Sequence, residues 1–226
     1  MQKHLILSGI LFSSAALANG TISGTVQLTG AAPKAAKVKR TSDPVCAKSA
    51  AEMDDLSIAV GKDGKSLDNV FVRLLNAPAG KAPAGDVVIS QHACNYEPRV
   101  QGAVTGQKVQ IKNEDGTLHN VHTYDGTKTV FNQAQPPSSA PIEKPLPAGA
   151  EVVKLRCDVH PWMAGYVIVN KSPYFSVSKD GKFEIKDVPA GTYQIEAWQE
   201  KLGTQKAEVK VEEGKAADVK FTFAGK

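Results

Sequence analysis

Cys157, His160 and Met163 form the most informative spacing in the sequence, Cys-x2-His-x2-Met, within one short segment. A thiolate, an imidazole and a thioether together suit copper, because soft sulfur favours Cu(I) and imidazole binds both oxidation states. The segment lies between two predicted strands, so the three side chains would share one tight loop. Apart from the initial methionine, the chain has only Met53 and Met163. A methionine beside Cys and His therefore indicates a ligand rather than a core thioether.

A second group of candidate ligands lies upstream. His119 and His122 follow a predicted strand that ends near Asn113. Two imidazoles, a thiolate and a weak axial methionine define an electron-transfer copper site. Residues three apart on a strand face opposite sides, so His119 and His122 rarely bind one ion together. His122 would then face outward or toward a partner. A tetrahedral zinc site of both histidines with Cys157 and His160 is the alternative.

Two other interpretations of the reactive side chains are weaker. Cys157 beside His160 could act as a catalytic nucleophile. No orienting carboxylate or glycine-rich oxyanion loop accompanies the pair, so we expect a protein that is not an enzyme. His92 follows a predicted strand, and we expect it to have a surface or structural role.

The composition predicts an all-β protein. The 226 residues are 42% hydrophobic, enough for a core, and the 19 Gly and 13 Pro suit a turn-rich chain. The net charge of +4 is small and scattered, so a nucleic-acid groove is not expected. Alternation of polar and apolar residues is frequent, and it puts Cys157 on the inward face of a strand containing Val153 and Leu155.

Several segments depart from simple alternation. The run 166–169 is apolar on both sides, which predicts a strand covered on both faces. The segments 76–85 and 133–150 are rich in Pro, Gly or Ala and are predicted to be surface loops. A short helix is weakly signalled around residues 47–56.

Residues 1–18 have the pattern of a signal peptide. A basic start, a short apolar run and Ala16-Leu17-Ala18 suit a cleaved secretory signal, and no other segment is apolar enough to span a membrane. We therefore expect a periplasmic or secreted protein. In an oxidising compartment cysteines tend to pair. If Cys157 binds metal, Cys46 and Cys94 remain, and we predict that they form a structural disulfide; two free buried thiols are the alternative.

Residues 87–170 resemble the cupredoxin (blue copper) family, most of all its amicyanin and plastocyanin group. The resemblance rests on His119-Asn120-Val121 and on Cys157-x2-His160-x2-Met163. It implies a Greek-key β-sandwich and one type 1 copper ion bound by His119, Cys157, His160 and axial Met163. Zinc, in the tetrahedral site described above, is the minor alternative. The resemblance also implies that Asn113 ties the two ligand loops together. The His160 imidazole would reach the surface within an apolar collar of Pro161 and Trp162, where a partner would dock.

Residues 171–226 resemble the carboxypeptidase-regulatory-like, or transthyretin-like, β domain, through Asp180-Gly181 and the Pro-x-Gly-x-Tyr turn at 189–193. This segment is thin for an independent sandwich. Residues 20–42 look like the opening strand and turn of the same fold, so they are expected to join it. The expected organisation is a signal peptide (1–18), an N-terminal β segment (19–86), a cupredoxin domain (87–170) and the smaller β-sandwich (171–226). The order resembles that of periplasmic methylamine-utilisation-type proteins.

The resemblance predicts a periplasmic one-electron carrier. Its redox partner would be a c-type cytochrome or a periplasmic dehydrogenase, with no nucleic acid and no membrane span involved. Two other functions stay open: a copper storage or delivery protein, and a glycan- or protein-binding β module with a structural metal. Tyr193 and Trp198 are the aromatic residues that such a module could use.

Overall fold

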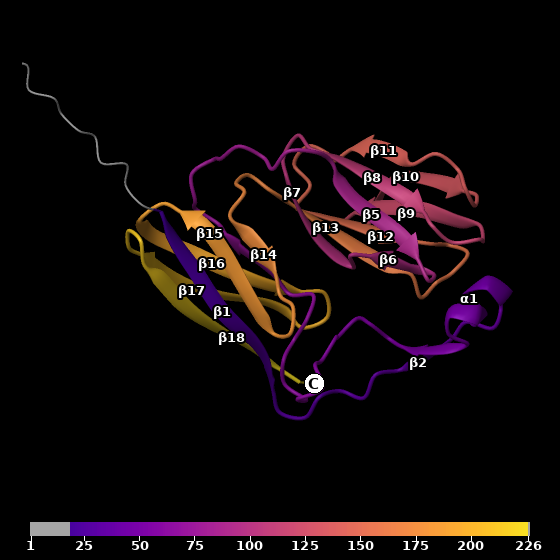
Figure 1. Cartoon of the computed structure of the whole chain (residues 1–226), viewed down its shortest axis with the longest axis horizontal. Coiled ribbons are helices and arrows are strands. Elements are labelled where there is room, and N and C mark those ends of the chain that lie inside the picture. Colours follow the sequence, from indigo (N-terminus) through magenta and orange to yellow (C-terminus); the bar gives the residue numbers. More distant parts are fainter. Residues whose placement is uncertain (1–18, 226) are drawn as a thin grey trace, which may run out of the picture.

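The structure is a computed structural model, and it describes residues 19–225. The predicted signal peptide lies outside these residues. Almost all of the regular structure is β, as the composition predicts, and no helix among residues 19–225 is long and apolar enough to cross a membrane. Figure 1 shows two sandwiches side by side, with the chain after β1 (Gly20–Thr29) running along the outside to β2 (Lys37–Lys39) and α1 (Pro44–Ser49).

The larger sandwich contains the candidate ligands. One of its sheets has the strand order β10-β9-β12-β13-β7 and the other has the order β11-β8-β5-β6. Its interior is filled by inward-facing aliphatic side chains together with Cys157 and Met163. The strands are β5 (Val87–His92), β6 (Asn95–Glu97), β7 (Val100–Val104), β8 (Lys108–Asn113), β9 (His119–Asp125), β10 (Lys128–Gln135), β11 (Ile142–Pro145), β12 (Val152–Arg156) and β13 (Ala164–Asn170).

The smaller sandwich combines both ends of the described chain. Its sheets have the orders β15-β1-β18 and β14-β4-β16-β17. The larger sandwich is therefore inserted between β4 and β14. The strands are β1 (Gly20–Thr29), β4 (Phe71–Leu74), β14 (Phe175–Val177), β15 (Lys182–Val188), β16 (Gly191–Gln199), β17 (Gly203–Val211) and β18 (Ala216–Ala224).

The N-terminal segment is divided between the two sandwiches. Gly20–Thr29 pairs with β15 and, in parallel, with β18, as residues 20–42 were expected to do. The rest of that range leaves the sheet. Residues 37–39 form β2 (Lys37–Lys39), which pairs with β3 (Glu52–Asp54) in a separate two-stranded ribbon around the helix α1 (Pro44–Ser49). We call residues 40–53 the arm.

Local signals explain why the helix begins earlier than predicted. Asp43 caps it, with its carboxylate accepting the N–H groups of Val45 and Cys46, and Pro44 occupies the first turn. The predicted loop 76–85 has no regular structure, but the predicted loop 133–150 contains the end of β10 and all of β11. There β11 pairs with β8, so sheet pairing overrides the proline-rich composition.

The two sandwiches meet along β13, which is covered on both faces as the sequence predicts. Val167 and Val169 enter the core of the larger sandwich, whereas Tyr166 and Ile168 pack toward the smaller one. Gly102 on β7 permits this close approach, because a Cβ atom there would lie 2.1 Å from the ring of Phe175. The ligand-bearing sandwich is therefore held against the smaller one by an apolar joint.

Candidate metal centre

The candidate ligands meet at one end of the larger sandwich. Strands β9 and β12 are antiparallel neighbours, with Arg156 opposite His122. His119 is the first residue of β9 and Cys157 follows the last residue of β12, so the pairing brings the two together. The loop from Cys157 to Met163 then turns back into β13 and carries His160 over the same end.

The donor atoms of three predicted ligands converge. Nδ1 of His119 lies 2.9 Å from Nδ1 of His160, which lies 3.7 Å from Sγ of Cys157. All three donor atoms lie within 4.8 Å of one another, and the residues are 0%, 1% and 1% exposed for His119, His160 and Cys157. Met163 is fully buried in the core cluster that contains Cys157, and its N–H donates to the carbonyl of His160.

The outer nitrogen of each imidazole faces a carboxylate. Nε2 of His119 lies 2.9 Å from Oδ2 of Asp115, and Nε2 of His160 lies 3.2 Å from Oδ2 of Asp43. A ring that donates its Nε2 proton to a carboxylate keeps a lone pair on Nδ1. The two lone pairs then face each other at 2.9 Å beside a thiol sulfur. This arrangement needs a cation between the donors, either a proton or a metal ion, so the donor set fits a metal.

The electrostatics of the site also favour a bound cation. Burial alone lowers the pKa of His119, but hydrogen bonds to Asp115 and Cys157 outweigh it and raise that pKa to about 9. Burial opposes ionisation of the Cys157 thiol, but the contact with His119 and backbone N–H groups lower its pKa overall. At His160, burial lowers the pKa more than Asp43 raises it. The metal-free centre therefore favours a proton on His119 and eases ionisation of the Cys157 thiol, and a metal ion would replace the proton on His119.

Asn120, rather than Asn113, ties the two ligand segments together. The backbone N–H of Asn120 points at Sγ of Cys157 at 3.5 Å, and its side-chain oxygen accepts the N–H of Asp158 at 2.5 Å. Asn113 instead donates to the carbonyls of Thr117 and Gln135. It shapes the loop before His119 and makes no hydrogen bond to the Cys157–Met163 loop. The prediction that Asn113 ties the two ligand loops together is therefore wrong, because its partners are Thr117 and Gln135.

The expectation that the His160 imidazole reaches the surface is also wrong. The arm lies over it, with Oδ2 of Asp43 at its Nε2, and the residue is only 1% exposed. Thr117 donates to the same carboxylate oxygen at 2.7 Å. The arm is fixed by the predicted disulfide between Cys46 and Cys94, whose Cα atoms are 5.6 Å apart. Asp43 and Asp115 are functional candidates that the sequence reasoning missed.

The other histidines lie apart from this cluster. His122 contacts Asp158, Thr129 and Tyr124, and it is not among the three converging donors. This position gives no support to a zinc site that needs His122 as the fourth ligand. The side chain of His92 is 57% exposed near Glu114, in agreement with a surface role.

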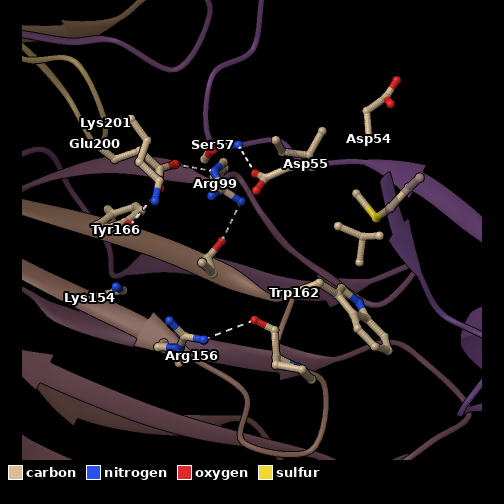
Figure 2. A pocket seen from close by; sticks show the side chains of 15 residues that line it. Asp54, Asp55, Ser57, Arg99, Lys154, Arg156, Trp162, Tyr166, Glu200 and Lys201 are labelled. Atoms are coloured by element: carbon tan, nitrogen blue, oxygen red, sulfur yellow. Dashed lines mark hydrogen bonds and ion pairs between the residues drawn. The ribbon is translucent and has the colours of Figure 1, made fainter. Parts of the chain in front are cut away.

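Pro161 and Trp162 line a surface cavity of about 140 Å³ that is bounded by Val38, residues 53–57 and both sandwiches (Figure 2). The Trp162 ring lies 5.1 Å from that of His160, centroid to centroid, and its Nε1 donates to the carbonyl of Cys94. Arg99 and Glu200 form an ion pair at 2.6 Å at the other end of the cavity. Trp162 is therefore the aromatic contact of His160 that reaches this cavity.

Comparisons with known proteins give partial matches. Residues 171–219 match the model of a family described as polysaccharide lyase family 4, domain II, which is a minor part of the chain. A search of curated proteins gives no match. Among solved structures, a purple cupredoxin from Nitrosopumilus maritimus is 26% identical, with a TM-score of 0.33, and the match covers 38% of this chain and 100% of that one.

Two amicyanin structures are similar to a comparable extent. One is a reduced variant with 22% identity and a TM-score of 0.34, covering 46% of this chain and 100% of that chain. Another is a Cu(I) form of a different variant with 23% identity and a TM-score of 0.33, covering 41% of this chain and 89% of that chain. TM-scores this low carry no functional argument, so the case for a metal rests on the donor geometry of this chain.

Proposed function

We propose that this chain binds one copper ion at His119, Cys157, His160 and Met163 and acts as a one-electron carrier rather than an enzyme. The observation that carries the proposal is the convergence of two imidazole Nδ1 atoms and one thiol sulfur in a buried pocket. A trigonal set of two nitrogens and one sulfur is the donor combination of electron-transfer copper sites. When bound, copper supplies a couple between Cu(II) and Cu(I).

The protein's contribution is to keep the donors in place. Asp115 and Asp43 fix the two ring orientations, and Asn120 fixes the start of the ligand loop. Burial of all three donors excludes water and oxidants from the thiolate. A rigid, dry donor set lets a bound ion change charge with little movement of the ligands.

The same features favour retention of the metal over delivery. A storage or delivery protein must release its ion, but here the disulfide-anchored arm covers His160. Glycan binding is less well supported, because both aromatic side chains that it could use are engaged in packing within the protein. Tyr193 is buried in the core of the smaller sandwich, and Trp198 packs edge-on against Tyr166 in the joint.

We place the docking of a redox partner at Pro161 and Trp162. Both line the cavity in Figure 2, which also contains Lys154 and Arg156. Neither of these cations has a carboxylate within 4.0 Å among residues 19–225. The lining also includes Asp54, Asp55 and Glu200, so its charges nearly balance, and a c-type cytochrome or a dehydrogenase would dock mainly on the apolar surface of Pro161 and Trp162. Such encounters bury little area. The disulfide supports an oxidising compartment such as the periplasm.

Voltammetry of the copper-loaded mature protein tests the proposal. We expect one copper per chain and a reversible one-electron wave that persists over repeated cycles. Loss of copper on reduction would support delivery instead. Failure of the folded protein to bind copper would refute the proposal.

A further inference from the structure

The two carboxylates that orient the histidine rings are themselves held by two half-cystines. Oδ1 of Asp43 accepts the backbone N–H of Val45 at 2.8 Å and that of Cys46 at 3.1 Å. Oδ2 of Asp115 accepts the backbone N–H of Cys94 at 2.9 Å. Cys46 thus contacts the carboxylate partner of His160, and Cys94 contacts the carboxylate partner of His119.

The disulfide closes these two chains of contacts into one unit. Cys46 and Cys94 are bonded to each other, and both are fully buried. From His119 the contacts run through Asp115 to Cys94, across the disulfide to Cys46, and through Asp43 to His160. The two rings also meet directly at their Nδ1 atoms, and Thr117, two residues before His119, donates to Asp43. The disulfide therefore joins the two segments that hold the carboxylate partners of both imidazoles.

The backbone at Cys94 shows that this unit is closely constrained. Ala93 and Cys94 have φ angles of 48° and 53°, the left-handed region that residues other than glycine rarely adopt. Such conformations persist only where the surroundings hold them. Here Arg40 of the arm donates to the carbonyl of Ala93 at 2.5 Å, and Trp162 of the ligand loop donates to that of Cys94 at 3.1 Å. The arm and the ligand loop thus both fix this turn.

We infer that the Cys46–Cys94 disulfide is a positioning element of the metal centre, which acts on both histidine ligands through Asp43 and Asp115. The inference rests on the proposed function, because it assigns a role toward the same metal. It differs from a purely structural role, in which the disulfide would only stabilise the fold by closing a loop. In the positioning role, its loss loosens the directions of both Nδ1 lone pairs even where the protein stays folded.

A double-mutant cycle on copper affinity tests this inference. The variants are Cys46→Ser/Cys94→Ser, Asp43→Ala/Asp115→Ala, and all four changes together, each titrated with Cu(II) against a competing chelator. Removing outer partners of metal ligands typically lowers affinity about 10- to 100-fold. We expect each double variant to lose affinity in that range. The fourfold variant should lose little more than either, because both pairs of changes break the same connection.

Two control variants separate positioning from general stability. Asp63→Ala removes an aspartate that also accepts two backbone N–H groups, those of Lys65 and Ser66, but lies in a turn beside β1. Gly102→Ala destabilises the joint between the sandwiches without touching a ligand. Both should keep the copper affinity and the visible spectrum of the parent protein. Circular dichroism of each metal-free variant establishes that it is folded before titration.

The outcomes distinguish this inference from the proposed function. If the parent protein binds no copper, the proposed function fails. If the parent binds copper and the disulfide variant binds it equally well with an unchanged charge-transfer band, the inference is overturned. It is overturned too if the losses in the fourfold variant multiply, because the disulfide would then act independently of the carboxylates. If the fourfold variant does not fold, threefold variants that combine Cys46→Ser/Cys94→Ser with either Asp43→Ala or Asp115→Ala allow the same comparison.

Discussion

Replacing Asp43 by Ala should open the arm and expose the metal-free site. The change removes the cap of α1, the bond from Thr117 and the contact with Nε2 of His160. A helix cap is worth about 1 kcal/mol, and each further buried hydrogen bond about 1 kcal/mol, so we expect local opening to become easier by about 2 to 3 kcal/mol. Because about 1.4 kcal/mol is a factor of ten, the open population should rise about 30- to 140-fold.

Alkylation of Cys157 measures this opening directly. It is the single cysteine outside the disulfide and is almost fully buried, so its reaction with iodoacetamide in the metal-free protein requires the site to open. Burial opposes ionisation of this thiol in the closed site, but contacts with His119 and backbone N–H groups outweigh it and lower the pKa. The Asp63→Ala variant should react at the parent rate. An unchanged rate in Asp43→Ala would refute the idea that Asp43 holds the arm closed.

Further predictions follow from the joint and from the titrating groups. Gly102→Val should lower the melting temperature in calorimetry, since its side chain would overlap the Phe175 ring; an unchanged value would show that the joint yields easily. Copper binding at pH 7.5 should release a proton from His119, whose pKa is raised to about 9, besides any proton released from Cys157. Calorimetry in buffers of different ionisation enthalpy should detect this release. Absence of proton release would contradict a metal-free site in which His119 is protonated. Hydrogen bonds to Asp43 outweigh burial and lower its pKa from 3.8 to about 2. Its contribution to stability is therefore complete above about pH 4 and is lost as the pH falls through 2; urea unfolding of the parent and Asp43→Ala proteins should converge over that range, and a constant difference would argue against it.

Local spacing made part of the site predictable. Cys157, His160 and Met163 lie within one loop, so their proximity follows from the sequence. The pairing of Cys46 with Cys94 followed once Cys157 was set aside as a ligand, and the structure confirms the disulfide. The apolar run 166–169 also predicted a strand covered on both faces, because apolar side chains on both faces favour burial. The structure shows this burial on both faces.

Contacts between distant segments were not predictable in the same way. Asp43 lies more than a hundred positions before His160, and long-range contacts of the arm, the disulfide and the ribbon of β2 and β3 among them, bring it there. Its one local signal, an aspartate followed by proline, predicts a helix start but not what the helix covers. The expected exposure of His160 failed for this reason. The sequence could not show whether Asn113 or Asn120 bridges the ligand segments, because this depends on the register between β9 and β12.

The visible absorption spectrum after addition of Cu(II) tests the central claim most directly. If the Nδ1 atoms of His119 and His160 and the sulfur of Cys157 bind the same ion, an intense thiolate-to-copper charge-transfer band should appear at one copper per chain. The Cys157→Ala variant, folded by circular dichroism, should lack it. A colourless complex, or a band that survives removal of Cys157, would contradict the account.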